Sequence, residues 1–298
     1  MPEPAPVPDA DGLVWDDRPE LLRPVLVAGF EGWNDAGNAA SDAAAWLTDR
    51  FGGSRFAWID PEEHFDYQSR RPEVELTDGV TRSITWPSND CFAVHVDTAD
   101  RDIVVLRGIE PSYRWRSFCR AVLTVAAETG CEMVVTLGAL LADVPHTRPV
   151  SITGSATDPD LIARLALTRS RYEGPTGIVG VLHDACRQAG VASASLWAPV
   201  PHYVATPPNP MATRALLDRF GRLVDVHLAL DELDDLGDDW RRRVDEVVAE
   251  DDDVREYVRK LEERAAQASV EDAELPSGED LAAEFEQFLR DQGPGSGA

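Results

Sequence analysis

A short apolar run, a polar turn and an alanine-rich stretch follow one another within Pro24–Leu47, and this pattern constrains the fold most. The run that begins at Val25 is short, contains β-branched residues and follows a proline, which is typical of a strand buried on both faces. The turn Glu31–Asp35 comes next, and the alanine-rich stretch predicts a helix with Asn34 or Asp35 as its N-cap. In open α/β sheets such turns lie at the carboxyl ends of the strands, where ligands usually bind.

Apolar runs and amphipathic stretches alternate through the first 230 residues. The further strands that we expect are residues 54–60, 80–86, 91–96, 102–106, 132–137, 150–154, 178–182 and 192–197. The further helices that we expect are residues 112–129, 158–167, 183–189 and 210–230. This alternation predicts an α/β fold with a mostly parallel central sheet covered by helices. The two alternating strands between residues 80 and 96 could instead form an antiparallel pair or an edge.

The character of the chain divides it into three parts. Residues 1–23 begin with an acidic, proline-rich stretch and are expected to be a flexible lead-in, and residues 24–230 form the α/β domain. Residues 231–298 hold 23 acidic and 8 basic side chains and are expected to be an acidic, helical C-terminal region. Apolar residues at helical spacing begin this region with a helical pair, and a last helix is expected near residues 279–289. The first stripe comprises Leu233, Leu236, Trp240, Val244 and Val247. Such stripes must pack on the domain or on a neighbouring subunit.

Composition excludes several classes of protein. The 298 residues carry a formal net charge of −26, and Lys260 is the single lysine, so we expect no binding to nucleic acid or to anionic membranes. No apolar run approaches the length of a membrane span, and the N-terminus does not resemble a secretory signal. The four cysteines are scattered without paired spacing, which indicates a reduced, cytoplasmic protein.

Polar turns follow four of the expected strands, and parallel strands would bring these turns to one edge of the sheet. The side chains that we expect to line a ligand pocket there are Glu31, Trp33, Asn34, Asp35, Glu110, His146, Thr147, Arg148, His202 and Tyr203. Among them are carboxylates and histidines suited to acid–base chemistry, and an arginine suited to binding an anion. The alternative is that they cap helices and join loops, since buried turns need such hydrogen bonds. No reacting centre can be placed, so we predict no catalytic residues.

Signatures of cofactor, metal and nucleophile chemistry are missing from the sequence. The chain has no glycine-rich phosphate loop, no paired-histidine zinc motif and no nucleophile elbow, so no cofactor and no metal are predicted. Ser151 or Ser155 could pair with His146 as nucleophile and base, but their spacing does not establish such a pair.

Several segments together resemble the proteasome assembly chaperone 2 family, in its actinobacterial branch. They are Phe30–Gly37 (FEGWNDAG), Gly108–Pro111 with Trp115 and Phe118, Val144–Pro149 (VPHTRP), Tyr172–Gly177 (YEGPTG) and Trp197–Tyr203. The resemblance implies a three-layer sandwich like that of purine nucleoside phosphorylases, and a homo-oligomer that is often a trimer in this branch. Relatives elsewhere hold proteasome α-subunits during assembly. The family offers no catalytic residues to carry over.

Two functions therefore stand as hypotheses. The first is a non-enzymatic, oligomeric, cytoplasmic protein that binds itself and protein partners, with proteasome α-subunits as the candidates. The second is a binding protein or enzyme that acts on a nucleoside, phosphate or carboxylate at the carboxyl edge of the sheet.

Overall fold

The computed structural model describes residues 8–77, 81–158, 168–169 and 173–274. The chain divides into two compact units, Met1–Glu246 and Val247–Ala298. The helix α6 (Asp231–Glu250) begins in the first unit, and α7 (Asp252–Glu274) belongs to the second. The helices expected at residues 158–167 and 279–289 lie outside the described residues, apart from Asp158.

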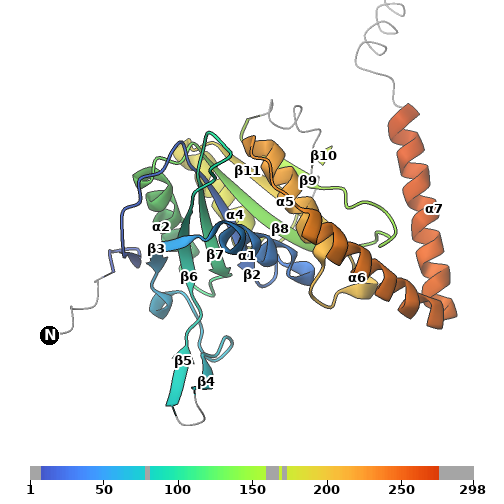
Figure 1. Cartoon of the computed structure of the whole chain (residues 1–298), viewed down its shortest axis with the longest axis horizontal. Helices are drawn as coiled ribbons and strands as arrows, with labels where there is room; N and C mark the ends of the chain where they lie inside the picture. Colours follow the sequence, from blue (N-terminus) through green and yellow to red (C-terminus); the bar gives the residue numbers. More distant parts are fainter. Residues whose placement is uncertain (1–7, 78–80, 159–167, 170–172, 275–298) are drawn as a thin grey trace, which may run out of the picture. The chain divides into compact units, whose positions relative to one another are not determined.

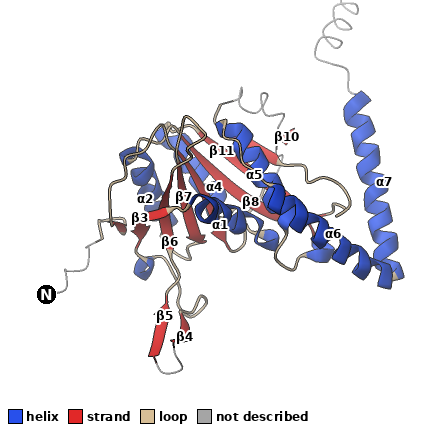
Figure 2. Cartoon of the chain, in the orientation of Figure 1, coloured by secondary structure: helices blue, strands red, loops and turns tan. Residues whose placement is uncertain are grey.

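A nine-stranded sheet forms the centre of the first unit (Figures 1 and 2). Its strands, in spatial order, are β1 (Leu13–Trp15), β3 (Ser54–Ile59), β6 (Asn89–Val94), β7 (Ile103–Ile109), β2 (Val25–Glu31), β8 (Met133–Ala142), β11 (Ser193–Pro201), β9 (Thr153–Ala156) and β10 (Thr168–Arg169). The four middle strands, β7, β2, β8 and β11, are parallel, and Val27 of β2 lies opposite Val105 and Val135. The strands β1, β3 and β6 on one side and β9 on the other pair antiparallel with their neighbours, apart from the parallel β9–β10 contact.

Helices cover both faces of this sheet. They are α1 (Ala39–Phe51), α2 (Trp115–Glu128), α4 (Ile178–Ala189) and α5 (Pro210–Val224). Successive side chains of a strand point to opposite faces, so Val25 and Val27 pack in the core beneath α1 and α5, whereas Leu26 and Ala28 pack beneath α2 and α4. The predicted three-layer α/β sandwich is therefore confirmed, and the helices α6 and α7 agree with the expected C-terminal helical region.

The strand expected at Ile178–Leu182 is wrong, because these residues form the first turns of α4. The short apolar run matched a buried strand by composition. Its buried residues nevertheless recur at helical spacing, since Ile178, Val179, Leu182 and Cys186 all face the core beneath one side of the helix.

The expected flexible lead-in is also wrong for Leu13–Trp15, which form β1 and pair with β3, with Leu13 opposite Ile59. No alternating pattern in this segment is long enough to reveal so short a strand. The strand expected at residues 80–86 is present as β5 (Thr81–Thr85), but its partner β4 (Glu73–Thr77) was not expected. The two strands form a hairpin with its own two-stranded sheet, which extends away from the main sheet (Figure 1).

The helix α6 presents an apolar stripe that differs from the predicted one. Leu233, Trp240 and Val244 are buried, as expected, but Leu236 and Val247 are 47% and 62% exposed. Leu233 belongs to the core beneath α1 and α5, so the start of α6 packs on the α/β domain. No helix among the described residues combines the length and apolarity that a membrane span requires.

Candidate functional site

The ten side chains expected to meet at the sheet do follow the carboxyl ends of parallel strands. Glu31 ends β2 and residues 33–35 follow it, Glu110 follows β7, His146–Arg148 follow β8, and His202 and Tyr203 follow β11. They lie at one edge of the sheet, where four of them, Asn34, Glu110, His146 and Tyr203, take part in two hydrogen-bonded groups, and a charged cavity lies beside them.

Glu110 is the centre of the first group. Its Oε1 atom accepts a hydrogen bond from Nδ2 of Asn34 at 2.9 Å and another from the backbone N of Ile178 at 2.9 Å. Its Oε2 atom lies 3.4 Å from the backbone N of Trp33. Ile178 is the first residue of α4, whose N-cap Gly177 has no side chain to offer. The Glu110 carboxylate therefore caps α4 in place of a local side chain, and a negative charge suits a helix N-terminus.

Residue 177 must be glycine, because the atoms of this group leave no room for a Cβ atom there. A Cβ atom on Gly177 would lie 2.1 Å from Nδ2 of Asn34 and 2.5 Å from Oε1 of Glu110. Asn34 is buried, and its backbone O accepts from the N of Ala139 at 2.7 Å, which ties the turn after β2 to β8. The turn is thus fixed to three other segments of the chain.

The fixed turn displays an aromatic side chain. Trp33 is 65% exposed although its neighbour Asn34 is only 2% exposed. Leu140 and Leu141, at the end of the adjacent strand β8, are 43% and 51% exposed. Trp33, Leu140 and Leu141 are called the edge apolar residues below. Exposed apolar side chains on a rigid support are typical of protein-binding surfaces.

Asp35 has a structural role. It is buried, and its Oδ1 accepts from the backbone N of Ala40 at 2.7 Å and of Ser41 at 3.2 Å, while its Oδ2 accepts from Oγ of Ser41 at 2.5 Å. These N–H groups belong to the first turn of α1, so the prediction that Asp35 caps this helix agrees with the hydrogen bonds, although Asn38 is the residue that immediately precedes it. Burial raises the pKa of Asp35 against the lowering effect of these hydrogen bonds.

His146 is the centre of the second group. Its Nδ1 lies 2.7 Å from Oη of Tyr203, its backbone N donates to the same oxygen at 2.8 Å, and its Nε2 lies 2.9 Å from Oδ1 of Asp245. The phenol that accepts from the backbone can donate its proton to Nδ1, which leaves Nε2 protonated to donate to Asp245. The indole of Trp240 contacts the imidazole edge-on, with ring centroids 6.5 Å apart. The group therefore fastens α6 to the exits of β8 and β11.

The remaining predicted residues lie at the surface. Thr147 and Arg148 are exposed, and Nδ1 of His202 lies 3.3 Å from Oδ1 of Asp143. Arg148 is not among the residues that line the cavity described next, so the predicted anion clamp is not part of it. Ser155, considered as a partner of His146, lies instead 3.4 Å from Nε2 of His183.

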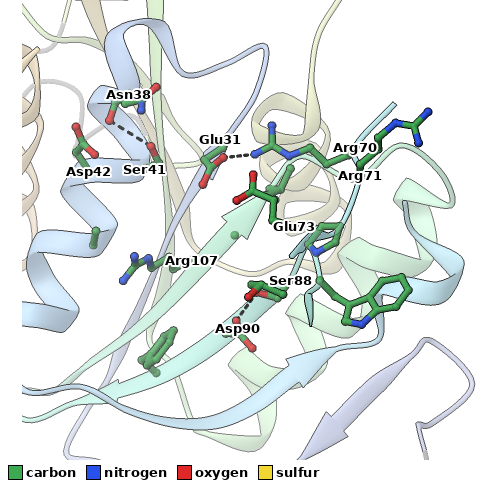
Figure 3. Close-up of a pocket in the computed structure, with 17 residues that line it drawn as sticks. Glu31, Asn38, Ser41, Asp42, Arg70, Arg71, Glu73, Ser88, Asp90 and Arg107 are labelled. Atoms are coloured by element: carbon green, nitrogen blue, oxygen red, sulfur yellow. Dashed lines mark hydrogen bonds and ion pairs between the residues drawn. The ribbon is translucent and has the colours of Figure 1, made fainter. Parts of the chain in front are cut away.

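A cavity of about 430 Å³ opens beside the ends of β2 and β7 (Figure 3). Of the ten predicted residues, Glu31 lines it, and it forms an ion pair with Arg70. Sequence reasoning missed the other charged side chains there. They are Asp42, Arg70, Arg71, Glu73, Asp90 and Arg107. Among them only Arg107 could have been placed from the sequence, because it directly follows the predicted strand 102–106 at the carboxyl edge.

Asp42 has the most perturbed carboxyl group of this cavity. Burial, with the nearby negative charge of Asp35, raises the pKa of Asp42 to about 6, and the guanidinium of Arg107 opposes the shift. Among the described residues, no group of three or more histidine, cysteine, aspartate or glutamate side chains is arranged to hold a metal ion.

The PAC2 family model matches residues 29–248. The chain belongs to the PAC2 family. Among solved structures, the PAC2 family protein of Streptomyces avermitilis is 52% identical, with a TM-score of 0.74, over 79% of this chain and 99% of its own. A proteasome-assembly chaperone homologue of Mycobacterium tuberculosis is 46% identical, with a TM-score of 0.74, over 78% of this chain and 99% of its own.

A more distant solved structure shares the fold. An archaeal proteasome activator of Pyrococcus furiosus is 18% identical, with a TM-score of 0.64, over 79% of this chain and 97% of its own. A search of curated proteins gives no significant match.

Residues that carry the sequence resemblance to this family contact one another in the structure of this protein. Asn34, Glu110 and Gly177 come from three of the quoted segments and form the first hydrogen-bonded group. His146 and Tyr203 come from two others and form the second. Tyr172 of the fourth segment lies outside the described residues.

Proposed function

We propose that this protein is a cytoplasmic, non-enzymatic chaperone of proteasome assembly that binds proteasome α-subunits at the carboxyl edge of its sheet. The observation that carries the proposal is the 65% exposed Trp33, which stands on a turn fixed by Asn34 and Glu110. The proteasome-assembly chaperone homologue at 46% identity supports the choice of partner.

The hydrogen bonds at this edge favour binding over catalysis. The carboxylate of Glu110 caps α4, that of Asp35 caps α1, and the imidazole of His146 joins Tyr203 to Asp245. General acid–base catalysis needs such a group within reach of a substrate. Each of these three groups makes hydrogen bonds that stabilise the fold, whereas the edge apolar residues are exposed to solvent.

Co-expression with proteasome α- and β-subunits from a proteasome-containing actinobacterium tests the proposal. We expect the full chain to co-purify with α-subunits and to increase the yield of half-proteasomes. Trp33→Ala should lower co-purification at least tenfold, since central aromatic residues carry much of the energy of an interface. The matched control is Leu22→Ala, because Leu22 is 56% exposed but precedes β2 at the opposite edge. No association at micromolar concentration, or equal loss in both variants, would refute this function.

We also propose that the protein associates with further copies of itself, through one face of the β4–β5 hairpin. Val74 lies directly opposite Ile84 in this hairpin, and Leu76 lies two residues along from Val74, on the same face. These three side chains are 60%, 59% and 62% exposed, respectively. A two-stranded sheet is marginally stable alone in water, so an identical face of a second copy is the occupant that we expect.

Light scattering after size-exclusion chromatography tests this association. The double variant Val74→Thr/Ile84→Thr should shift the protein towards the monomer, whereas Ser83→Thr, on the opposite face of the same strand, should leave the oligomer unchanged. A wild-type chain that is monomeric at tens of micromolar would refute self-association without bearing on α-subunit binding.

A further inference from the structure

The charged cavity lies where the fold opens a crevice between two neighbouring parallel strands. β2 leads to α1 on one face of the sheet, whereas β7 leads to α2 on the opposite face. Adjacent strands whose connections leave on opposite faces diverge at their carboxyl ends, and ligands of open α/β sheets bind in that crevice. Glu31 at the end of β2 and Arg107 near the end of β7 both line the cavity (Figure 3). Its volume of about 430 Å³ is in the range of small-molecule sites.

The charges around the cavity indicate what could bind there. Three arginines and four carboxylates line it, a closer balance than the 28 basic and 54 acidic side chains of the whole chain. An inorganic anion would meet the four carboxylates, and a simple cation would meet the three guanidinium groups. A small molecule that carries both an ammonium and a carboxylate group meets an opposite charge at each end.

Arg107 and Asp42 line the cavity from β7 and α1, two elements of the central sandwich, whereas Arg71 and Glu73 are exposed residues at the start of the β4–β5 hairpin. Nη1 of Arg107 lies 3.4 Å from Oγ1 of Thr48 and 3.7 Å from the exposed carboxylate of Asp49, which are loose contacts that leave other N–H donors. Asp42 is half-buried, and the guanidinium of Arg107 acts on its carboxyl group electrostatically without a direct ion pair. By contrast Arg70 is paired with Glu31, and Asp90 accepts from Ser88 at 2.6 Å.

We propose that the cavity binds a free α-amino acid, with its carboxylate on Arg107 and its ammonium group on Asp42. A guanidinium fork matches a carboxylate in geometry. Phe92 and Trp86, which also line the cavity, offer apolar surface to the side chain of the amino acid. The site is separate from the edge apolar residues, so failure to bind an amino acid would not refute the proposed chaperone function, and the reverse also holds.

Thermal-shift and calorimetric titrations of the full chain with L-leucine and L-phenylalanine test the proposal. We expect saturable stabilisation by either amino acid at millimolar concentration. The matched probes are leucinamide, which lacks the carboxylate, and N-acetyl-leucine, which lacks the ammonium group, and each should bind at least tenfold more weakly. The proposal would be overturned if L-leucine, leucinamide and N-acetyl-leucine bound equally, or if only leucinamide or only N-acetyl-leucine stabilised the protein. It would also be overturned if neither amino acid gave a saturable shift at concentrations up to 10 mM.

Variants and pH identify the two anchoring groups. Arg107→Gln and Asp42→Asn should each weaken binding at least tenfold, whereas Arg50→Gln, on the same helix as Asp42 but outside the cavity, should not. The charged groups that line the cavity with Asp42 or act on its carboxyl group are Glu31, Asp35, Glu73, Asp90, Arg70, Arg71 and Arg107. Wild-type binding should weaken about tenfold from pH 7 to pH 5, as Asp42 is protonated, and Asp42→Asn should remove most of that dependence. Folded variants that keep wild-type affinity would refute the assignment.

Discussion

Asn34 and Glu110 are joined side chain to side chain, with Nδ2 of Asn34 donating to Oε1 of Glu110 at 2.9 Å. The same oxygen accepts from the backbone N of Ile178. The turn after β2, the exit of β7 and the start of α4 thus meet at one carboxylate, although 68 residues separate Glu110 from Ile178. A contact of this kind fixes the edge of the sheet on which Trp33 is displayed.

Replacement of Glu110 by alanine should destabilise the protein by about 1–3 kcal/mol, because it leaves a part-buried amide and the first N–H of α4 without their acceptor. Urea unfolding followed by circular dichroism measures the change. Glu173→Ala is the control, since Glu173 precedes the same helix but is exposed. Hydrogen exchange should also quicken at the first turn of α4. A loss of stability no larger than that of the control would show that the carboxylate is dispensable.

Two glycines should respond to alanine in opposite directions. A Cβ on Gly29 would lie 2.4 Å from the backbone O of Ala40, so Gly29→Ala must push α1 away from β2 and should destabilise by about 2 kcal/mol or more. A Cβ on Gly237 would lie 3.4 Å from Cγ of Met211, an ordinary contact. Gly237→Ala within α6 should therefore stabilise by about 0.5–1 kcal/mol through helix propensity. Thermal and urea unfolding of both variants provide the measurement, and a shift of the same sign in both would contradict this account.

The common edge of the four parallel strands could be predicted because the alternation of strands and helices follows from the hydrophobic pattern and indicates a parallel sheet. Asn34 and Glu110 therefore belonged to one expected site, and they touch. Their partner Ile178 was misassigned to a strand, since five apolar or small residues satisfy a buried strand and a buried helix equally well. The capping role of Glu110 could not be seen without the correct position of that helix.

The rest of the site could not be predicted, because its side chains contact partners that are distant in the sequence. Asp245, which bonds His146, is 99 residues away from it in the sequence and lies within an acidic segment where nothing distinguishes it from its neighbours. Arg70 reaches the cavity from the turn that precedes β4, and Asp42 reaches it from the helix α1. The local sequence pattern does not predict such contacts, because they depend on how complete helices and strands pack together.

Stability should depend on pH through Asp42. Its pKa is raised to about 6 in the folded protein, so its contribution is favourable below the unfolded value near 4 and is lost as pH rises through 6. Asp42→Asn removes the cost of an ionised, half-buried carboxylate. We expect the variant to be more stable than wild type by about 1 kcal/mol at pH 7, after allowance for solvent screening, and equally stable near pH 4.

Urea unfolding of both proteins at pH 4, 5, 6 and 7 measures the difference. Asp49→Asn, also on α1, is the control, because Asp49 is exposed. A difference between Asp42→Asn and wild type that does not grow with pH would refute the raised pKa.

Tyr203→Phe should loosen α6, because the phenol oxygen accepts from the backbone N of His146 and contacts its Nδ1. Without this oxygen a buried N–H and a ring nitrogen lose their partner, which should destabilise by about 1–3 kcal/mol. The imidazole is then free to turn away from Asp245, so hydrogen exchange should quicken in the part of α6 around Trp240. Asp239→Asn is the control, since Asp239 pairs only locally, with Arg242 on the same helix. If exchange in α6 is the same in Tyr203→Phe as in wild type, this hydrogen-bonded group does not hold the helix, and the packing of Leu233 and Trp240 must be sufficient.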